Sequence, residues 1–246
     1  MKNSIVFLFI ISIAGVACSQ KQTTTTPTNT TSIEAKPTKE NMAAKRANTD
    51  VRKISEYIDG KDYSAYKVAT FAGGCFWCTE ASFERINGVV DVISGYSGGK
   101  ESYPTYKEVS YGRTTHAEAI QVYYDPAVIN FDKLLDVFFV AHDPTTLNRQ
   151  GPDKGPHYRS AIYYHNDTQK DLIDKKIKDL TAANAFRNPI VTEVAAYEEF
   201  WTAEAYHQDY YEINPGSSYI QSVSRPKVEK VKKVFKDILK KKYMTK

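Results

Sequence analysis

The chain has 246 residues, 41% of them hydrophobic and 13% aromatic, which allows one well-packed domain with additional tails. The net charge of +4 is unevenly distributed, because residues 226–246 hold nine lysines and the rest of the chain is slightly acidic. No cluster of stacking aromatic residues accompanies this basic segment, so the composition argues against a nucleic-acid partner.

The first 18 residues have the layout of a bacterial secretory signal. Lys2 precedes the largely apolar run 5–17, which ends in small residues before Cys18. The run is shorter than the ~20 residues that span a bilayer. Residues 15–18 (GVAC) resemble the lipobox of bacterial lipoproteins, which predicts lipidation of Cys18; simple cleavage with loss of Cys18 is the alternative. In either case we expect an exported protein, periplasmic or anchored to a membrane.

The next segment, residues 19–62, includes a stretch rich in Thr, Pro, Lys and Asn and almost free of large apolar groups. Such a stretch cannot bury enough surface to order itself. We therefore predict a disordered tether over 19–62, which would hold a folded catalytic domain, residues 63–225, away from a membrane surface.

The predicted elements of the folded part alternate between strands and helices. In chain order they are a strand at 66–71, a helix at 75–87, a strand at 89–95, a short helix at 106–110, a strand at 117–124, a helix at 131–142, a polar loop at 145–157, a strand at 159–164, a helix at 167–185, a strand at 190–196 and helices at 201–211 and 226–243. This alternation predicts an α/β (α+β) fold, a two-layer sandwich with a mixed sheet and a C-terminal helix.

The stretch GGCFWCTE at 73–80 places two thiols at the start of a predicted helix. Backbone N–H groups and the helix dipole favour a thiolate there, so we predict a lowered pKa for Cys75. If Cys18 is lipidated or removed, Cys75 and Cys78 are too few for a disulfide scaffold but suit a redox pair. The bulky Phe76 and Trp77 between them would hold an apolar group, such as a methyl, beside the sulfur.

Glu118 lies near the start of an otherwise apolar strand. If it is half-buried, its pKa rises, and a protonated carboxyl group can donate a proton to a departing oxygen atom. The alternative is an ordinary exposed glutamate at a sheet edge. A single CxxC without a second pair is a poor zinc site, and no phosphate-binding loop motif is present, so we expect neither a metal nor a cofactor.

Six ordered motifs between about residues 67 and 219 resemble those of the peptide methionine sulfoxide reductases of the A type. They are GCFWC at 74–78, GYSGG at 95–99, GRTTHAEA at 112–119, FFVAHDPT at 138–145, RQGPDKG at 149–155 and YRSAI at 158–162. The resemblance implies a ferredoxin-like plait core and reduction of methionine-S-sulfoxide, in oxidised proteins or peptides or as the free amino acid, to methionine.

The resemblance also implies a role for each site residue. Cys75 attacks the sulfoxide sulfur while the substrate methyl group rests against Phe76 and Trp77, and Cys75 is left as a sulfenic acid. The other implied site residues are Glu118 as the acid, Tyr96 and Tyr158 as hydroxyl donors to the oxygen, and Asp153, His207 and Tyr210 as residues of the substrate pocket. For His207 and Tyr210 the alternative is aromatic packing with a surface histidine.

Relatives often place the cysteine that resolves the sulfenic acid in a C-terminal tail, but this chain has no cysteine after Cys78. The resemblance therefore implies a Cys75–Cys78 disulfide that a thioredoxin-like partner reduces. The alternative is that Cys78 only packs and an external thiol regenerates the enzyme.

The sequence leaves two other functions open besides sulfoxide reduction. One rival is a CxxC oxidoreductase acting on protein disulfides, which has no use for Phe76-Trp77 or for Glu118; the other is a non-enzymatic lipoprotein.

Residues 226–246 form a basic C-terminal helix that we expect to pack on the domain, with a membrane-surface role for its lysines as the alternative. The residues of its predicted apolar face are Val228, Val231, Phe235, Ile238 and Leu239.

Overall fold

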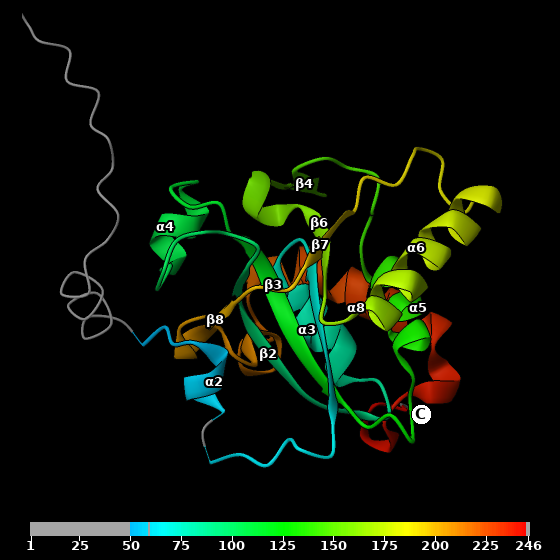
Figure 1. The fold of residues 1–246 in the computed structure, drawn as a ribbon, viewed down its shortest axis with the longest axis horizontal. Coiled ribbons are helices and arrows are strands. Elements are labelled where there is room, and N and C mark those ends of the chain that lie inside the picture. The colour runs from blue at the N-terminus through cyan, green and yellow to red at the C-terminus, as the bar shows by residue number, and fades with distance from the viewer. Residues whose placement is uncertain (1–49, 59, 245–246) are drawn as a thin grey trace, which may run out of the picture. The chain divides into compact units, whose positions relative to one another are not determined.

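The computed structural model describes residues 50–58 and 60–244 (Figure 1). The predicted signal segment 1–18 with Cys18, and residues 19–49 of the predicted tether, lie outside the described residues. No helix in the described ranges is both long and apolar enough to cross a membrane.

The domain is built on a six-stranded mixed sheet with the strand order β7-β6-β1-β3-β2-β8. Only β6 and β7 pair in parallel; the other neighbours are antiparallel. The strands are β1 (Lys67–Gly73), β2 (Val89–Ser97), β3 (Ala117–Tyr124), β6 (Ser160–Tyr164), β7 (Glu193–Ala196) and β8 (Phe200–Thr202). A separate small hairpin consists of β4 (Arg149–Gln150) and β5 (Asp153–Lys154).

The helices of the described residues are α2 (Ile54–Tyr57), α3 (Phe76–Glu84), α4 (Tyr106–Ser110), α5 (Phe131–Ala141), α6 (Asp167–Ala182), α7 (Tyr210–Ile213) and α8 (Arg225–Val234). The order β1-α3-β2-β3-α5-β6, with β6-β1-β3-β2 side by side in the sheet, is a ferredoxin-like plait. This confirms the predicted fold class. Strands β7 and β8 extend the plait at its two edges.

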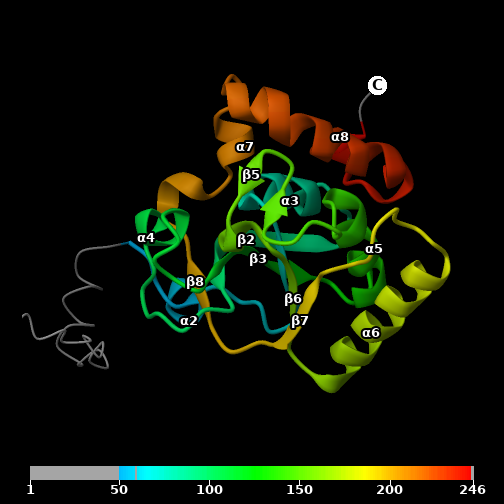
Figure 2. The same cartoon turned by 90° about the horizontal axis from the view of Figure 1, so that it is seen from above.

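Side-chain alternation along the strands decides which groups face the helices. In β3, Ile120 and Val122 belong to the core cluster under α3 and α5, whereas Ala119 and Tyr123 belong to the cluster on the other face. Because alternate residues of a strand share a face, Glu118 lies on the side of α3. Tyr96 of β2 is its register partner, so it lies on the same side. Figure 2 shows α3 and α8 together on this side of the sheet, with α2 on the other.

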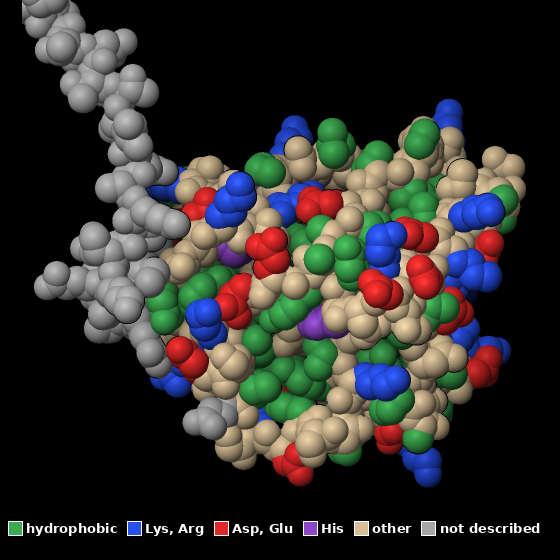
Figure 3. Space-filling model, in the orientation of Figure 1, with side chains coloured by type: hydrophobic (Ala, Val, Ile, Leu, Met, Phe, Trp, Pro, Cys, Tyr) green, Lys and Arg blue, Asp and Glu red, His purple; other side chains and the backbone are tan. Residues whose placement is uncertain are grey.

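Residues 51–58 differ from the predicted tether, because they pack against the domain. Val51 and Ile54 are buried, and the Arg52 carbonyl accepts a hydrogen bond from the Thr202 N–H at 2.8 Å. The polar part of the predicted tether has almost no large apolar side chains, whereas these two aliphatic side chains give residues 51–58 enough apolar surface to pack on the domain. Ile54 joins the second face of the sheet, where Figure 3 shows hydrophobic side chains gathered over β2 and β3. The boundaries of the predicted domains otherwise stay predictions.

The predicted helix at 201–211 is wrong. Trp201 lies in β8 and pairs with Tyr96, His207 lies in a short 3-10 turn at Ala205–His207, and α7 begins only at Tyr210. Asp209 adopts a left-handed conformation with φ of 54°, which interrupts any continuous helix. Backbone pairing with the edge of the sheet has therefore overridden the local helical pattern.

The predicted helix at 226–243 is correct only as far as Val234. Its expected packing is confirmed, since Val228 and Val231 are fully buried. Beyond α8 the chain turns back onto the end of α3: Leu239 forms an isolated β-bridge with Ile86, and the Asn87 N–H donates to the Ile238 carbonyl at 2.7 Å. These long-range backbone bonds replace the helical ones.

Candidate active site

Cys75 stands at the junction between β1 and α3. The chain leaves β1 through Gly74, whose φ of 87° suits glycine and where a Cβ atom would collide with the side chain of Gln150. Cys75 is then the N-cap residue of α3, and only 4% of its surface is exposed. Cys78, one turn into the helix, is 2% exposed, and both cysteines are free.

The prediction of a lowered pKa for Cys75 is wrong, because burial dominates. Desolvation raises the pKa of the Cys75 thiol well above its usual value, and the hydrogen bond and negative charge of Cys78 raise it further. The same hydrogen bond is the largest cause of the lowered pKa of Cys78, about 7, to which Lys227 and Ser224 contribute against the effect of burial. The two thiols therefore share a proton that rests on Cys75, and the negative charge develops on Cys78.

Glu118 is a buried carboxyl group next to this pair. It is 2% exposed, and its Oε2 accepts a hydrogen bond from the Phe76 N–H at 3.1 Å, in the first turn of α3. Burial raises the pKa of Glu118 to about 8, with Asp153 and Cys78 contributing through their negative charge. The side chain is thus protonated at neutral pH, and the alternative of an exposed edge glutamate does not hold.

The two tyrosines predicted to meet the substrate oxygen come from different elements of the fold. Tyr96 is buried in β2, and its hydroxyl donates to Glu204 Oε2 at 2.8 Å; Glu204 Oε1 accepts from the Tyr106 N–H at 2.8 Å. Tyr158 lies in the short turn Pro156–Tyr158, where burial and the charge of Glu118 raise its pKa. Burial also raises the pKa of Tyr96, so both hydroxyl groups stay protonated, and that of Tyr96 is donated to Glu204.

An aromatic wall surrounds the start of α3. The Phe76 ring lies 5.0 Å from the His207 ring, and Trp77 stacks on Tyr210 at 3.8 Å with an interplanar angle of 11°. Trp77 Nε1 donates to His207 Nδ1 at 3.2 Å, so that nitrogen carries no proton. Burial lowers the pKa of His207 to about 4. His207 is therefore neutral and orients the indole ring of Trp77.

The loop predicted at 145–157 contains the β4–β5 hairpin, which brings Asp153 to the site. Tyr219 donates its hydroxyl proton to Asp153 Oδ2 at 2.6 Å, and its hydroxyl group is also close enough to Cys75 to offset part of the rise in the pKa of that thiol. The Tyr219 ring meets Trp77 edge-on at 5.7 Å. Asp153 thus fixes a hydroxyl group over the thiol.

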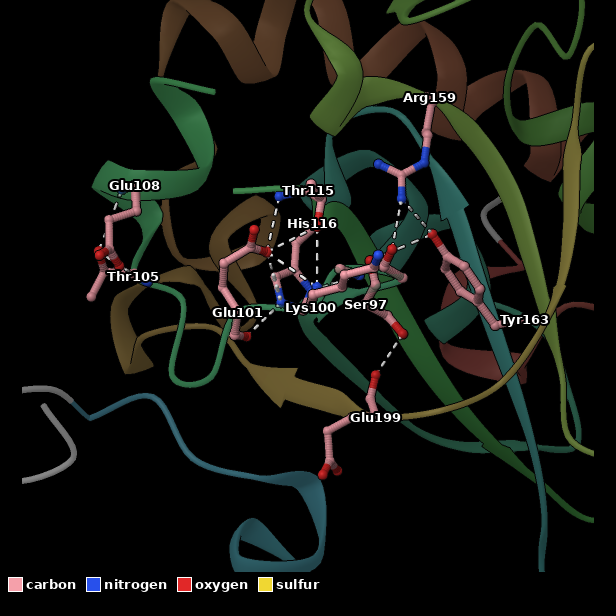
Figure 4. Close-up of polar contacts among 12 residues, drawn as sticks. Ser97, Lys100, Glu101, Thr105, Glu108, Thr115, His116, Arg159, Tyr163 and Glu199 are labelled. Atoms are coloured by element: carbon pink, nitrogen blue, oxygen red, sulfur yellow. Dashed lines mark hydrogen bonds and ion pairs between the residues drawn. The ribbon is translucent and has the colours of Figure 1, made fainter. Parts of the chain in front are cut away.

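A polar network fixes the loop that follows β2 against the residues that precede β3, close in sequence to Tyr96 and Glu118 (Figure 4). His116 accepts from the Gly99 N–H at 3.2 Å through Nδ1, and its Nε2 lies 2.8 Å from the Glu101 carbonyl oxygen. On the other side of the loop, Arg159 donates to the Tyr163 hydroxyl at 3.2 Å. His116 is therefore bonded through both ring nitrogens and serves the structure of the loop.

Every predicted site residue except Cys18, which lies outside the described residues, is found around Cys75. Glu204 and Tyr219 also belong to the site, and the sequence does not predict them. Glu204 falls in the stretch that was wrongly predicted as helix, and no local pattern marks Tyr219 as facing the thiol. Within the described ranges, no cluster of three or more His, Cys, Asp or Glu side chains is suited to hold a metal ion.

Comparison with known proteins places this site in a family. The family model described as peptide methionine sulfoxide reductase matches residues 67–239. Peptide methionine sulfoxide reductase MsrA 1 of Rhodopirellula baltica is 53% identical over 186 residues, which cover 76% of this chain and 96% of that protein. The MsrA of Thermus thermophilus is 47% identical over 173 residues, covering 70% and 97%.

Solved structures agree with the sequence relatives. Mxr1 from Saccharomyces cerevisiae in reduced form superposes with a TM-score of 0.57 at 40% identity, covering 63% of this chain and 90% of that chain. Methionine sulfoxide reductase A of Corynebacterium diphtheriae gives a TM-score of 0.54 at 36% identity, covering 61% and 76%. The chain with its buried CxxC and protonated glutamate therefore belongs to the peptide methionine sulfoxide reductases of the A type, and it is an enzyme of that family.

Proposed function

We propose that the enzyme reduces the S epimer of methionine sulfoxide, in oxidised proteins or peptides and as the free amino acid, through a sulfenic acid on Cys75. The observation that carries this proposal is the buried Glu118, 2% exposed and protonated at neutral pH, which hydrogen-bonds to the first turn of the helix that Cys75 caps. A disulfide exchanger has no need of such an acid.

The first step is a transfer of oxygen from the substrate sulfur to Cys75. Because Cys75 and Cys78 share a proton, its movement to Cys78 leaves the thiolate on Cys75. Glu118 protonates the sulfoxide oxygen, which makes the substrate sulfur electrophilic. Tyr158 donates a hydrogen bond to the same oxygen, and Tyr96 does so when the substrate oxygen replaces Glu204 as its acceptor. Cys75 ends as a sulfenic acid and loses two electrons, which the substrate sulfur gains as methionine leaves.

The second step returns Cys75 to its reduced state. Cys78 attacks the sulfenic sulfur, an S–S bond forms, the S–O bond breaks, and the hydroxide takes up a proton to leave as water. A dithiol partner of the thioredoxin kind then reduces the disulfide by exchange. The position of Cys78 one turn from Cys75, on the same end of α3, supports this assignment.

A turnover assay on the separate S and R epimers of a methionine sulfoxide peptide, with dithiothreitol as reductant, tests the activity. We expect turnover of the S epimer and none of the R epimer. Faster reduction of insulin disulfides than of the sulfoxide would favour the CxxC oxidoreductase, and no turnover of any sulfoxide would favour the non-enzymatic lipoprotein.

The Cys78→Ser variant tests the second step. It should release about one equivalent of methionine in a single turnover, because the first step uses Cys75 and its proton donors. Recycling by thioredoxin should then fail, whereas a small thiol that reaches the sulfenic acid should restore it. Full cycling of Cys78→Ser with thioredoxin would show that Cys78 only packs.

We also propose that the chain is exported and anchored through a lipid on Cys18, on the evidence of the sequence of residues 1–18. The Cys18→Ser variant should move from the membrane fraction to the soluble fraction of the producing cells or remain unprocessed. An exported wild type without an acyl group on its N-terminal residue would support simple cleavage instead.

A further inference from the structure

The resolving thiol of the proposed mechanism faces the basic C-terminal segment. Cys78 Sγ lies 3.2 Å from Ser224 Oγ and 3.9 Å from Lys227 Nζ. Ser224 is fully buried and Lys227 is partly buried. Within residues 50–58 and 60–244, no carboxylate forms an ion pair with Lys227, so its charge is directed at the thiol.

The helix α8 holds this ammonium group in place. Ser224 and Lys227 are three residues apart, a spacing that puts both on one face of a helix. Val228 and Val231, fully buried, fix α8 against the core, and α8 packs on α3, as Figure 2 shows. The position of Lys227 relative to Cys78 is therefore set by core packing and not by a flexible surface chain.

The charges that act on Cys78 come from three elements. The hydrogen bond of the Cys75 thiol lowers the pKa of Cys78 most, and burial raises it; Lys227 and Ser224 lower it, and Asp153 of β5 raises it. Glu118 of β3 and Tyr219 are further titratable neighbours, and burial keeps both protonated at neutral pH. When Cys75 is a sulfenic acid, it no longer has a thiol proton to donate to Cys78. Lys227 is then the positive charge that stabilises the Cys78 thiolate.

We infer that Lys227, together with Ser224, is a positioning residue for the regeneration half of the reaction, which holds Cys78 as a thiolate. The inference rests on the proposed role of Cys78 as the resolving cysteine. The Cys78 thiolate is needed in two steps. It attacks the sulfenic sulfur of Cys75 to form the disulfide. When a partner thiolate later attacks the disulfide at Cys75, Cys78 departs more readily as a stabilised thiolate. The lysine-rich segment thereby acquires a role inside the active site.

The test compares Lys227→Met with Lys227→Arg in the full chain. Methionine keeps the length of the side chain and removes the charge, and arginine keeps the charge. Lys233→Met, on the exposed side of the same helix, is the matched control. Methionine release in the first turnover serves as the reference for each variant, and the rate of disulfide formation after that release is followed as a function of pH.

Loss of the charge should raise the pKa of Cys78 by about one unit. At pH values below the pKa of Cys78 in both proteins, the thiolate fraction then falls about tenfold, while the more basic thiolate is about threefold more nucleophilic, so disulfide formation slows roughly threefold. At pH values above the pKa of Cys78 in both proteins, the thiol is ionised in each, and Lys227→Met should equal or exceed the wild type. Lys227→Arg and Lys233→Met should follow the wild-type profile.

Two results separate failure of this inference from failure of the proposed function. If the wild type releases no methionine, the proposed function fails. If it releases methionine and Lys227→Met resolves the sulfenic acid with the wild-type pH profile, the role of Lys227 is overturned. A uniform slowing at every pH would also overturn it, because a merely structural defect does not depend on the titration of Cys78.

A measurement without substrate gives an independent check. In a Cys75→Ser background, the ultraviolet absorbance of the thiolate is titrated with and without Lys227→Met, and a variant lacking both Cys75 and Cys78 is subtracted to remove Cys18. The titration of Cys78 should move upward by about one pH unit on loss of the lysine charge. If Cys78 titrates at the same pH with and without Lys227→Met, the inference is contradicted.

Discussion

Cys75 and Glu118 are both buried titratable groups, and burial raises the pKa of each because a buried thiolate or carboxylate loses its hydration. The consequences differ. For Glu118 the shift creates a proton donor at neutral pH, as reduction of a sulfoxide requires. For Cys75 the shift keeps the thiol protonated, and Cys78 is the cysteine of the pair with the lower pKa.

Replacing the carboxyl group tests its role as the acid. Glu118→Gln should slow the first step by ~10²–10⁴-fold, the usual effect of a lost general acid. Because the pKa of Glu118 is about 8, the ratio of wild-type to variant rates should be constant below pH 8 and fall above it. Stopped reactions that measure methionine release across pH 6–10 provide the comparison, and an equal rate for both proteins would remove Glu118 from the mechanism.

Glu118→Gln should lower the activity but raise the stability of the folded protein. Glu118 has a folded-state pKa of about 8 against 4.5 for the free group, so the folded protein retains a proton that the unfolded chain loses. Stability from this group is complete below pH 4.5 and is lost as the pH rises toward 8. At pH 7, Glu118→Gln should therefore increase the free energy of unfolding by roughly 2 to 3 kcal/mol.

Urea unfolding at several pH values measures this difference. The two proteins should have similar stability near pH 4 and diverge as the pH rises. A wild type that is the more stable protein at pH 7 would show that the charged carboxylate is favoured in the folded state.

At the scale of elements, the site is assembled from the ends of several pieces of the fold. The turn between β1 and α3 places Cys75, the paired strands β2 and β3 place Tyr96 opposite Glu118, and the β4–β5 hairpin places Asp153. Helix α8 covers α3 and carries Lys227 to Cys78. Packing of α8 therefore affects both the stability of the fold and the surroundings of Cys78.

Two valines of α8 test that packing. Val231→Ala removes two methyl groups from a fully buried position and should lower the free energy of unfolding by roughly 2 kcal/mol. Val234→Ala, three residues on, changes a side chain that is 53% exposed and should stay within about 0.5 kcal/mol of the wild type. Equal losses in denaturant titrations would mean that α8 does not pack as described.

At the scale of the whole molecule, the sheet has two faces with different covers. Helices α3 and α5 close the face that carries the site. On the other face, α2 and the residues that follow it pack on β1, β2 and β3, and the Arg52 backbone pairs with Thr202 of β8. The segment before β1 is thus part of the packed domain, and it supports the edge strand next to the aromatic site residues.

A pair of shortened chains tests this contribution. A chain that begins at residue 63 loses the buried side chains of Val51 and Ile54 and should unfold at a temperature lower by roughly 5 °C than a chain that begins at residue 50. Calorimetry on the two chains measures the difference. Coincident unfolding temperatures would return residues 50–62 to the predicted tether.

The sequence by itself determined the local chemistry of this protein. A strand followed by two glycines and a helical pattern specified where Cys75 stands, and period-two alternation specified that Glu118 lies within a strand, because such signals depend on neighbours only a few residues away. The six motifs identified the family for the same reason, because each is a short contiguous run of residues that can be read without knowing its tertiary contacts.

Only the tertiary structure decided the contacts between distant segments. Tyr96 meets Glu204 across 108 residues of sequence, and Cys78 meets Lys227 across 149. The 201–211 stretch became a strand and two short helical turns because the edge of β2 supplied backbone partners that no local pattern reveals. The pKa of Cys75 also reversed direction, because a helix N-terminus is readable in sequence, whereas the burial that outweighs it is a property of the assembled fold.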